Sequence, residues 1–177
     1  ADMPAVDILV PGEGEQTLVE LLAALETGAP LDAVKGIIYR GPDGQAVATP
    51  MRPPLADHDL LPLPARHLYE ARLYVPLPNQ SRRPPMAPVM TSRGCAYGKC
   101  RFCFQGGRYA PPYRRRSPEN VIGELKQLAA RGVREILFWD DNFCMNEKWV
   151  LRFCDLLHAE GLDLLWRVFG RVDTVTE

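Results

Sequence analysis

Three of the five cysteines in this 177-residue chain fall within nine residues, in the stretch Thr91-Ser92-Arg93-Gly94-Cys95-Ala96-Tyr97-Gly98-Lys99-Cys100-Arg101-Phe102-Cys103. The apolar segment Pro88-Val89-Met90 precedes it and is typical of the end of a buried strand. Glycines allow a tight backbone turn, because glycine has no Cβ. Cysteine thiolates at such spacings hold iron–sulfur clusters, and cubic clusters usually take four. Either a distant residue is a fourth ligand, or one iron stays open for a substrate.

Other roles for these cysteines remain open from the residues alone. Free cysteine is often a small buried hydrophobic residue, disulfides belong mainly to secreted proteins, and zinc sites usually take four ligands in two pairs. Nothing in the sequence marks the chain as secreted, so we favour a metal centre, with iron–sulfur ahead of zinc. Cys144 is a candidate fourth ligand for a closed site. Cys154 lies in an amphipathic pattern that indicates a core position.

At these cysteines the chain resembles the radical S-adenosylmethionine (SAM) superfamily. The usual signature of that family is C-x3-C-x2-C after the first strand of a barrel, with an aromatic residue before the third cysteine. Phe102 occupies the aromatic position, and the gap from Cys95 to Cys100 is one residue longer than usual. The resemblance implies a 4Fe–4S cluster on Cys95, Cys100 and Cys103, with SAM chelating the open iron and Phe102 beside the cofactor.

Composition limits the remaining classes of function. With 21 Lys and Arg against 22 Asp and Glu, the formal net charge is −1, which gives no electrostatic case for nucleic acid or an anionic membrane. No apolar run approaches the about 20 residues that span a bilayer. The basic, aromatic segment 108–116 could bind nucleic acid, but we favour a solvated or substrate-facing loop. We expect a cytoplasmic protein, and a piece of a longer chain, since both ends look cut through folded units.

The first 50 residues predict a strand, a turn, a helix and a hairpin. Residues 6–10 read as a strand, and 16–26 as a helix with Leu18, Leu21, Leu22 and Leu25 at helical spacing. Residues 35–40 and 45–49 flank a Pro-Asp-Gly turn, which is typical of a hairpin. Strand, glycine-rich turn and helix form the building unit of an open α/β sheet.

This segment, with V-D-I-L-V-x-G-E-G-E and V-K-G-I-I-Y-R, is similar to the tail of the cobalamin-binding domain of cobalamin-dependent radical SAM enzymes. The resemblance implies three parts: residues 1–50 end a Rossmann-like cobalamin-binding domain, 51–87 form a proline-rich linker, and 88–177 begin the radical SAM barrel. The candidate cofactor-binding residues of the first part are Gly12, Glu13, Gly14 and Glu15. A D-x-H-x-x-G motif is absent, and we assign no cobalt to His58.

The rest of the chain predicts alternating helices and strands. Ser117-Pro118 is typical of a helix start, and this helix should run to Arg131. A strand over 133–139, a helix over 146–160 and a strand over 164–169 should follow. The fold class is therefore α/β, with a βαβαβ part of a partial (β/α) barrel and right-handed crossovers.

Polar residues follow the second predicted barrel strand, where such barrels place their chemistry. Asp140 or Asp141 could accept hydrogen bonds from the ammonium group of SAM, with Asn142 beside them. Alternatively, this acidic pair caps the next helix or binds a neighbouring arginine. Near the end of the third strand, Arg167 and Arg171 are candidates for contact with a carboxylate.

These observations together predict an enzyme. The resemblance implies reductive cleavage of SAM and a cobalamin-dependent methyl transfer to an unactivated carbon, on a small-molecule or peptide substrate. It also implies an electron donor such as flavodoxin or ferredoxin. Radical cyclisation, rearrangement or methylthiolation is the alternative within the family. A non-catalytic zinc or closed iron–sulfur module is the alternative from another class.

Overall fold

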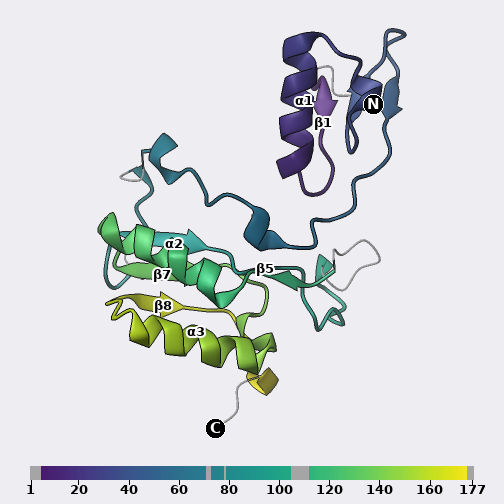
Figure 1. Cartoon of the computed structure of the whole chain (residues 1–177). Helices are drawn as coiled ribbons and strands as arrows, with labels where there is room; N and C mark the ends of the chain where they lie inside the picture. Colours follow the sequence, from purple (N-terminus) through teal and green to yellow (C-terminus); the bar gives the residue numbers. More distant parts are fainter. Residues whose placement is uncertain (1–4, 71–72, 78, 105–111, 175–177) are drawn as a thin grey trace. The chain divides into compact units, whose positions relative to one another are not determined.

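The computed structural model describes residues 5–70, 73–77, 79–104 and 112–174 (Figure 1). The chain divides into two compact units, Ala1–Leu55 and Ala56–Glu177. The division falls inside the segment that we predicted as a proline-rich linker. Most of that segment therefore packs with the second unit.

The first unit is one helix with a small sheet. Strands β1 (Ile8–Leu9), β2 (Ile38–Arg40) and β3 (Ala46–Ala48) pair in that order, and both pairs are antiparallel. Helix α1 (Glu15–Thr27) ends at Gly28, whose φ of 68° is a left-handed conformation that glycine adopts readily. The predicted order of strand, helix and hairpin is confirmed, although no two described strands of this unit are parallel.

The helix that the leucine spacing predicts over 16–26 is confirmed as α1, but most of its leucines lie outside the core. Thr17, Leu21 and Ala24 are buried. The following apolar side chains of the helix are half-exposed or more: Leu18, Leu22 and Leu25. The described core of this unit is small, and Leu21 and Ala24 alone reach it from the helix.

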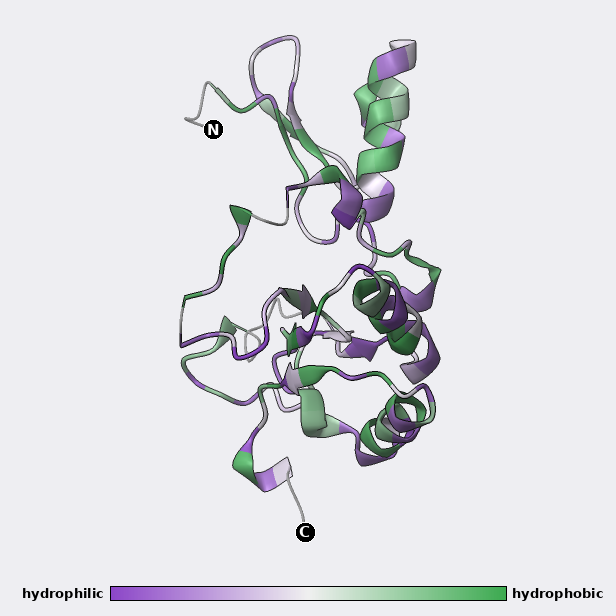
Figure 2. Cartoon of the chain, turned by 90° about the vertical axis from the view of Figure 1, so that its left-hand side faces the viewer, coloured by the Kyte–Doolittle hydropathy of each residue, from purple (hydrophilic) through white to green (hydrophobic). Residues whose placement is uncertain are grey.

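The second unit is built on a parallel sheet in the order β4-β7-β8 (Figure 1). Its strands are β4 (Met86–Val89), β7 (Glu135–Phe138) and β8 (Leu165–Arg167). Helices α2 (Pro118–Ala130) and α3 (Glu147–Ala159) lie on the same side of this sheet (Figure 2). The predicted βαβαβ order is confirmed. The carboxyl ends of the three strands lie along one edge, because all three are parallel.

Aromatic rings fill the space between the sheet and its two helices. Phe138, Phe143 and Phe153 are fully buried, with ring centroids 5.0 to 5.8 Å apart. Helix α2 begins at Ser117, whose hydroxyl accepts a hydrogen bond from Asn120 N at 3.1 Å, as its sequence predicts. The contact between Phe138 of β7 and Phe153 of α3 holds this helix against the sheet.

A short ribbon, which the sequence did not predict, follows β4. Strand β5 (Ser92–Arg93) pairs antiparallel with β6 (Arg114–Arg115), so the prediction of a loop is wrong for these two arginines. The guanidinium carbon of Arg115 lies 4.1 Å from the ring centroid of Trp149, and Nη2 donates to Phe143 O at 2.6 Å. These contacts offset only part of the cost of burial, which lowers the pKa of Arg115, because Nε and Nη1 have no hydrogen-bond partner among the described residues. Residues 105–111, including part of the basic segment, lie outside the described residues.

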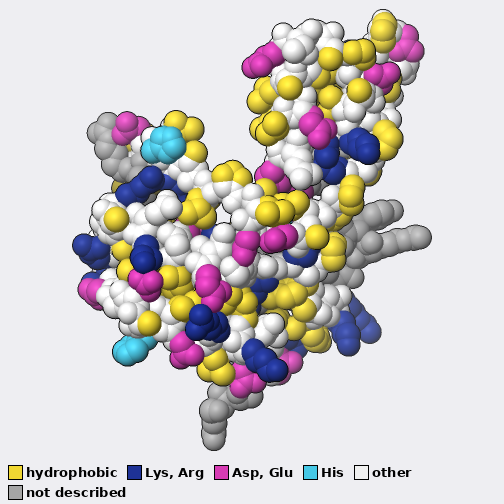
Figure 3. Space-filling model, in the orientation of Figure 1, with side chains coloured by type: hydrophobic (Ala, Val, Ile, Leu, Met, Phe, Trp, Pro, Cys, Tyr) yellow, Lys and Arg dark blue, Asp and Glu magenta, His cyan; other side chains and the backbone are white. Residues whose placement is uncertain are grey.

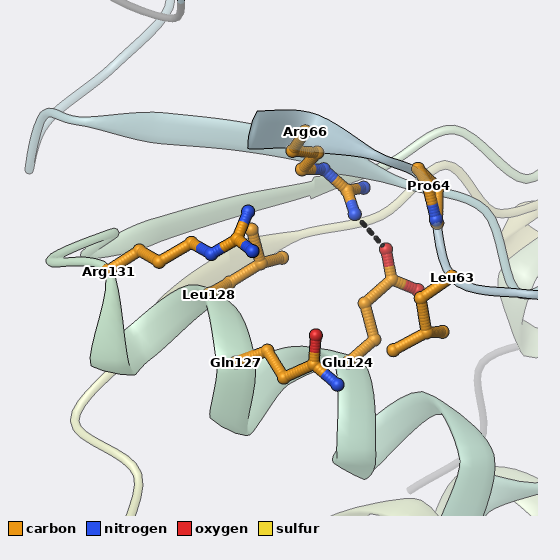
Figure 4. A pocket seen from close by; sticks show the side chains of 7 residues that line it. All are labelled: Leu63, Pro64, Arg66, Glu124, Gln127, Leu128 and Arg131. Carbon is orange, nitrogen blue, oxygen red and sulfur yellow. Dashed lines mark ion pairs between the residues drawn. The ribbon is translucent and has the colours of Figure 1, made fainter. Parts of the chain in front are cut away.

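The segment before β4 is anchored on α2 by a buried carboxylate. Glu124 is buried, and its two oxygens each lie 2.5 Å from a guanidinium nitrogen, one of Arg66 in this segment and the other of Arg116. Figure 4 shows the ion pair with Arg66. The same two arginines donate to the backbone at the end of β4, to Pro88 O at 2.8 Å and Met90 O at 2.9 Å. Two cations compensate for the desolvation of one carboxylate, so this cluster holds the segment around Arg66, α2 and β4 together.

A second buried carboxylate lies at the start of β7. Glu135 accepts hydrogen bonds from Ser81 Oγ at 2.9 Å, Arg82 N at 2.6 Å and Arg83 N at 2.9 Å, and Arg167 Nε lies 3.3 Å away. Burial opposes ionisation of this carboxyl, but the three hydrogen bonds and the cation outweigh it and lower the pKa of Glu135.

The surface carries both charge signs. Acidic and basic side chains are interspersed over the face of the second unit in Figure 3. Within the described ranges, no helix has the length and apolar character that crossing a membrane requires.

We predict that Glu135→Gln reduces the acid sensitivity of the second unit. Because the folded-state pKa is lowered, the carboxylate stabilises the fold above the ordinary value of 4.5, and this contribution is lost as the pH falls through the folded-state pKa. Urea unfolding between pH 6 and about 3 measures the effect. All three tryptophans lie in the second unit, so their fluorescence reports on it alone.

Glu147→Gln is the matched control, because it removes an exposed carboxyl from the start of α3. If Glu135→Gln and wild type lose stability in parallel as the pH falls, the role of Glu135 is contradicted.

Candidate cluster and cofactor site

The three clustered cysteines lie on the loop that leaves strand β5. Gly94 and Gly98 have φ values of 78° and 53°, which ordinary side chains rarely adopt, so the predicted need for glycine is confirmed there. Cys103 N donates to Cys100 O at 3.2 Å and closes a turn. Cys95, Cys100 and Cys103 are free thiols of intermediate exposure. The thiols are therefore accessible and not consumed by disulfides.

Across the part of the chain that the structure describes, no group of three or more His, Cys, Asp or Glu side chains is arranged to hold a metal ion. The donor set nevertheless fits an iron–sulfur cluster by its chemistry, because three thiols at short spacing are the ligands that such clusters take. The loop must bring these thiols together when it binds a cluster. Phe102, which stands within this loop, is 93% exposed, so its ring is accessible.

Asp140 joins the ends of two strands to the start of the cysteine loop. It is 1% exposed and follows β7 by two residues. Its carboxylate accepts from Thr91 N at 3.1 Å, from Thr91 Oγ1 at 2.8 Å and from the hydroxyl of Ser92. These donors occupy the carboxylate, so Asp140 positions the loop in this structure. Sequence reasoning missed both hydroxyl partners, although Thr91-Ser92 stands directly before the loop.

The next two residues are placed differently. Asp141 is exposed. Partial desolvation of its carboxyl, together with the charge of Asp140, raises the pKa of this group. Asn142 is 2% exposed, and neither its amide nitrogen nor its amide oxygen has a hydrogen-bond partner among the described residues. Buried amides are normally bonded, so Asn142 is a candidate to bind a polar group of a ligand. Three adjacent residues of the sequence therefore have different surroundings in the structure.

An apolar row crosses the same edge of the sheet. Met90, Trp139 and Phe169 follow β4, β7 and β8 and are about half-exposed. Phe138 and Val89 are register partners that pack toward the helices, so the residues after them face the other side. The rings of Trp139 and Phe169 lie 5.8 Å apart. This row was not predicted, because its three residues are far apart in the sequence and come to one edge only through the parallel pairing of the strands.

The two arginines near β8 contact carboxylates of the chain itself. Arg167 pairs with Glu135. Arg171 donates from Nε and Nη2 to the carboxylate of Asp173 at 2.9 and 2.8 Å, and its guanidinium carbon lies 3.5 Å from the ring centroid of Tyr97. Arg171 therefore connects the end of β8 with the cysteine loop.

The remaining two cysteines pack against the core of the second unit. Cys144 and Cys154 are partly buried there, which confirms the predicted surroundings of Cys154. Burial is the main cause that raises the pKa of the Cys154 thiol, and Asp155 adds to it. A β-carbon added at Gly170 would lie 3.5 Å from Cys144 Sγ, so the chain after β8 passes close to this residue.

In the first unit, the turn before α1 carries the other candidate residues. Gly12 has a φ of 84°, and a β-carbon at Gly14 would come within 3.3 Å of Val10. Glu13 accepts a hydrogen bond from Leu55 N at 3.1 Å, and Glu15 begins α1. Two acidic side chains beside the helix start disfavour a phosphate there.

Comparison with known proteins indicates a family for this chain. Residues 89–174 match the family model of the Radical SAM superfamily. A methyltransferase of Pyrococcus horikoshii is 35% identical over 99% of this chain and 37% of that protein. The anaerobic magnesium-protoporphyrin IX monomethyl ester cyclase of Rubrivivax gelatinosus is 33% identical over 98% of this chain and 31% of that protein. The chain thus spans about a third of the length of these relatives.

Solved structures agree on the fold. The cobalamin-dependent S-adenosylmethionine radical enzyme OxsB, with aqua-cobalamin and SAM bound, has a TM-score of 0.74 and 22% identity over 96% of this chain and 24% of that chain. The methyltransferase TsrM of Kitasatospora setae, with cobalamin and a 4Fe–4S cluster bound, has a TM-score of 0.59 and 23% identity over 90% of this chain and 32% of that chain. The mixed α/β fold of these enzymes is therefore confirmed.

We predict that Asp140→Asn destabilises the second unit. The amide would direct an NH2 group toward donors, leaving buried groups unpaired at a cost of about 1–3 kcal/mol. Tryptophan-monitored urea unfolding measures this change. Asp141→Asn is the matched control, and as a surface change it should alter stability by less than about 0.5 kcal/mol. Equal stability of the two variants would contradict the positioning role of Asp140.

Proposed function

Because the chain belongs to the radical SAM superfamily, we propose that it is part of an enzyme that binds a 4Fe–4S cluster through Cys95, Cys100 and Cys103. The observation that carries this proposal is the position of the cysteine loop, at the carboxyl end of the first of three parallel strands. In barrels of this kind the chemistry lies at that edge. When bound, the cluster would supply the electron that cleaves SAM reductively.

Three local thiolates leave one cluster position free of protein ligands, which suits a small chelating substrate. Asp141 is the carboxylate best placed for the ammonium group of SAM, since it is exposed at the edge of the sheet while Asp140 is occupied. Asn142 offers a buried donor and acceptor. Asp140 keeps the loop start in place through Thr91 and Ser92. Phe102 would lie beside the cofactor.

The second part of the proposal is methyl transfer to an unactivated carbon with cobalamin. Residues 1–50 would be the end of a Rossmann-like cobalamin-binding domain, 51–87 the linker and 88–177 the start of the barrel. Gly12, Glu13, Gly14 and Glu15 would contact cobalamin at the turn before α1. The similarity over nearly the whole chain to a relative named an uncharacterized methyltransferase supports the methyl transfer.

The substrate would be a small molecule or a peptide. The row of Met90, Trp139 and Phe169 would give its site an apolar floor that a bound substrate covers. A soluble one-electron carrier such as flavodoxin or ferredoxin would reduce the cluster.

Radical cyclisation is a second candidate, and one finding favours it. The relative from Rubrivivax gelatinosus is named a cyclase and is similar over nearly the whole chain. Both reactions use the same cluster and SAM, so they differ in the substrate and in the fate of the substrate radical. Product analysis with full-length protein distinguishes a methylated product from a cyclised one.

We predict that replacing any one of Cys95, Cys100 and Cys103 with Ser abolishes stable cluster binding. Anaerobically reconstituted wild type should hold about four irons per chain. Each of the three variants should lose most of the iron and its visible absorbance, because a hydroxyl is a poor substitute for a thiolate ligand.

Cys144→Ser and Cys154→Ser are the matched controls and should keep the wild-type iron content. A closed site or a zinc module predicts the reverse for Cys144, whose replacement would then release the metal. Zinc in the purified wild type, lost on replacing Cys144, would contradict the open cluster.

We also predict that Asp141→Asn weakens SAM binding while leaving the iron content unchanged. Loss of a charge-assisted hydrogen bond should raise the Kd for SAM about tenfold or more. Equilibrium dialysis of the reconstituted protein with labelled SAM measures this. Asp155→Asn, an exposed carboxyl on α3, is the control. Wild-type affinity in Asp141→Asn would exclude this carboxylate from the SAM site.

A further inference from the structure

We propose that Arg171 anchors the cysteine loop to the end of strand β8 and that its ion pair with Asp173 tunes the reduction potential of the cluster. The inference rests on the proposed function, because it takes the cluster on Cys95, Cys100 and Cys103 as given. It assigns the region after β8 a role in setting the reduction potential of the cluster.

The anchor is a cation–π contact. The guanidinium carbon of Arg171 lies 3.5 Å from the ring centroid of Tyr97, which is well inside the range of such contacts. Tyr97 stands between Cys95 and Cys100, so a side chain that fixes this ring also fixes the first half of the loop. Arg171 is the last residue before a short turn, Val172–Thr174, where Thr174 Oγ1 donates to Arg171 O at 2.8 Å.

The backbone that carries Arg171 is itself held close to the site. Phe143 N donates to Phe169 O at 2.9 Å and links the chain after β8 to the chain after β7. The chain also passes close to Cys144 at Gly170, where a β-carbon would lie in van der Waals contact with Cys144 Sγ, at 3.5 Å. Arg171 follows directly, so its side chain starts from a fixed point.

The ion pair between Arg171 and Asp173 has a defined orientation relative to the cysteine loop. Arg171 donates two hydrogen bonds to Asp173 in a fork geometry, at 2.9 and 2.8 Å. This pairing raises the pKa of Arg171, and the thiol of Cys100 contributes in the same direction. The guanidinium of Arg171 is the group of the pair that lies over the Tyr97 ring, so the positive charge of the pair contacts the loop.

This orientation affects the redox equilibrium. On reduction the cluster gains one electron from an external one-electron donor, and its negative charge increases by one. A nearby cation stabilises the reduced form more than the oxidised form, and a nearby anion does the opposite. Removing Arg171 should therefore lower the reduction potential, and removing the charge of Asp173 should raise it. Both side chains are partly exposed, so salt should reduce both shifts.

The experiment is a redox titration of the anaerobically reconstituted full-length protein with dithionite and mediators. Reduced cluster is quantified by electron paramagnetic resonance in wild type, Arg171→Gln and Asp173→Asn. We expect shifts of opposite sign, each a three- to tenfold change in the reduced-to-oxidised ratio at fixed potential. Tenfold corresponds to about 59 mV for one electron. Arg171→Lys, which keeps the charge, should return the potential toward the wild-type value.

Arg152→Gln is the matched control, since it removes an exposed arginine that pairs with Glu119 on the surface. Wild-type potentials in both Arg171→Gln and Asp173→Asn, with the cluster intact, would overturn this inference and leave the proposed function standing. A wild-type protein that binds no iron would overturn the proposed function and this inference with it. Loss of iron from Arg171→Gln, but not from Arg171→Lys, would support the anchoring role.

Discussion

The hydrogen bonds of one buried carboxylate connect the fold to its candidate site. Asp140 follows β7 and binds the backbone and hydroxyl of Thr91 and the hydroxyl of Ser92, which lead into the cysteine loop. Parallel pairing brings the carboxyl ends of β4 and β7 to one edge, and Asp140 fixes them together there. The position of Cys95 relative to the sheet therefore depends on a residue that need not touch any cofactor.

The same principle recurs at two other places in the second unit. Glu124 pairs with Arg66 and Arg116, which in turn bind backbone carbonyls at the end of β4. At the opposite end of the sheet, Glu135 accepts hydrogen bonds from the Ser81 hydroxyl and from the backbone N–H groups of Arg82 and Arg83. Each buried carboxylate is compensated by several donors, as burial of charge requires. Irregular segments thus gain a defined place without regular hydrogen bonding of their own.

Much of this fold follows from patterns in the sequence, but its buried charges do not. Apolar periodicity and the Ser117 cap predict the helices and parallel strands, and the cysteine spacing predicts the family. Glu124 and Arg115 look like surface residues, because charged side chains are normally exposed. Their burial depends on partners distant in the sequence. For the same reason Asp140 and Asp141 look equivalent in the sequence, and only the contacts of Thr91 and Ser92 separate them.

The central claim is a 4Fe–4S cluster with an iron open to SAM, and electron paramagnetic resonance tests it most directly. The measurement compares the anaerobically reconstituted, reduced full-length protein with and without SAM, alongside iron and zinc analysis. The account predicts about four irons per chain and a spectrum that SAM shifts. A zinc-loaded protein, or an iron–sulfur spectrum that SAM leaves unchanged, would contradict it.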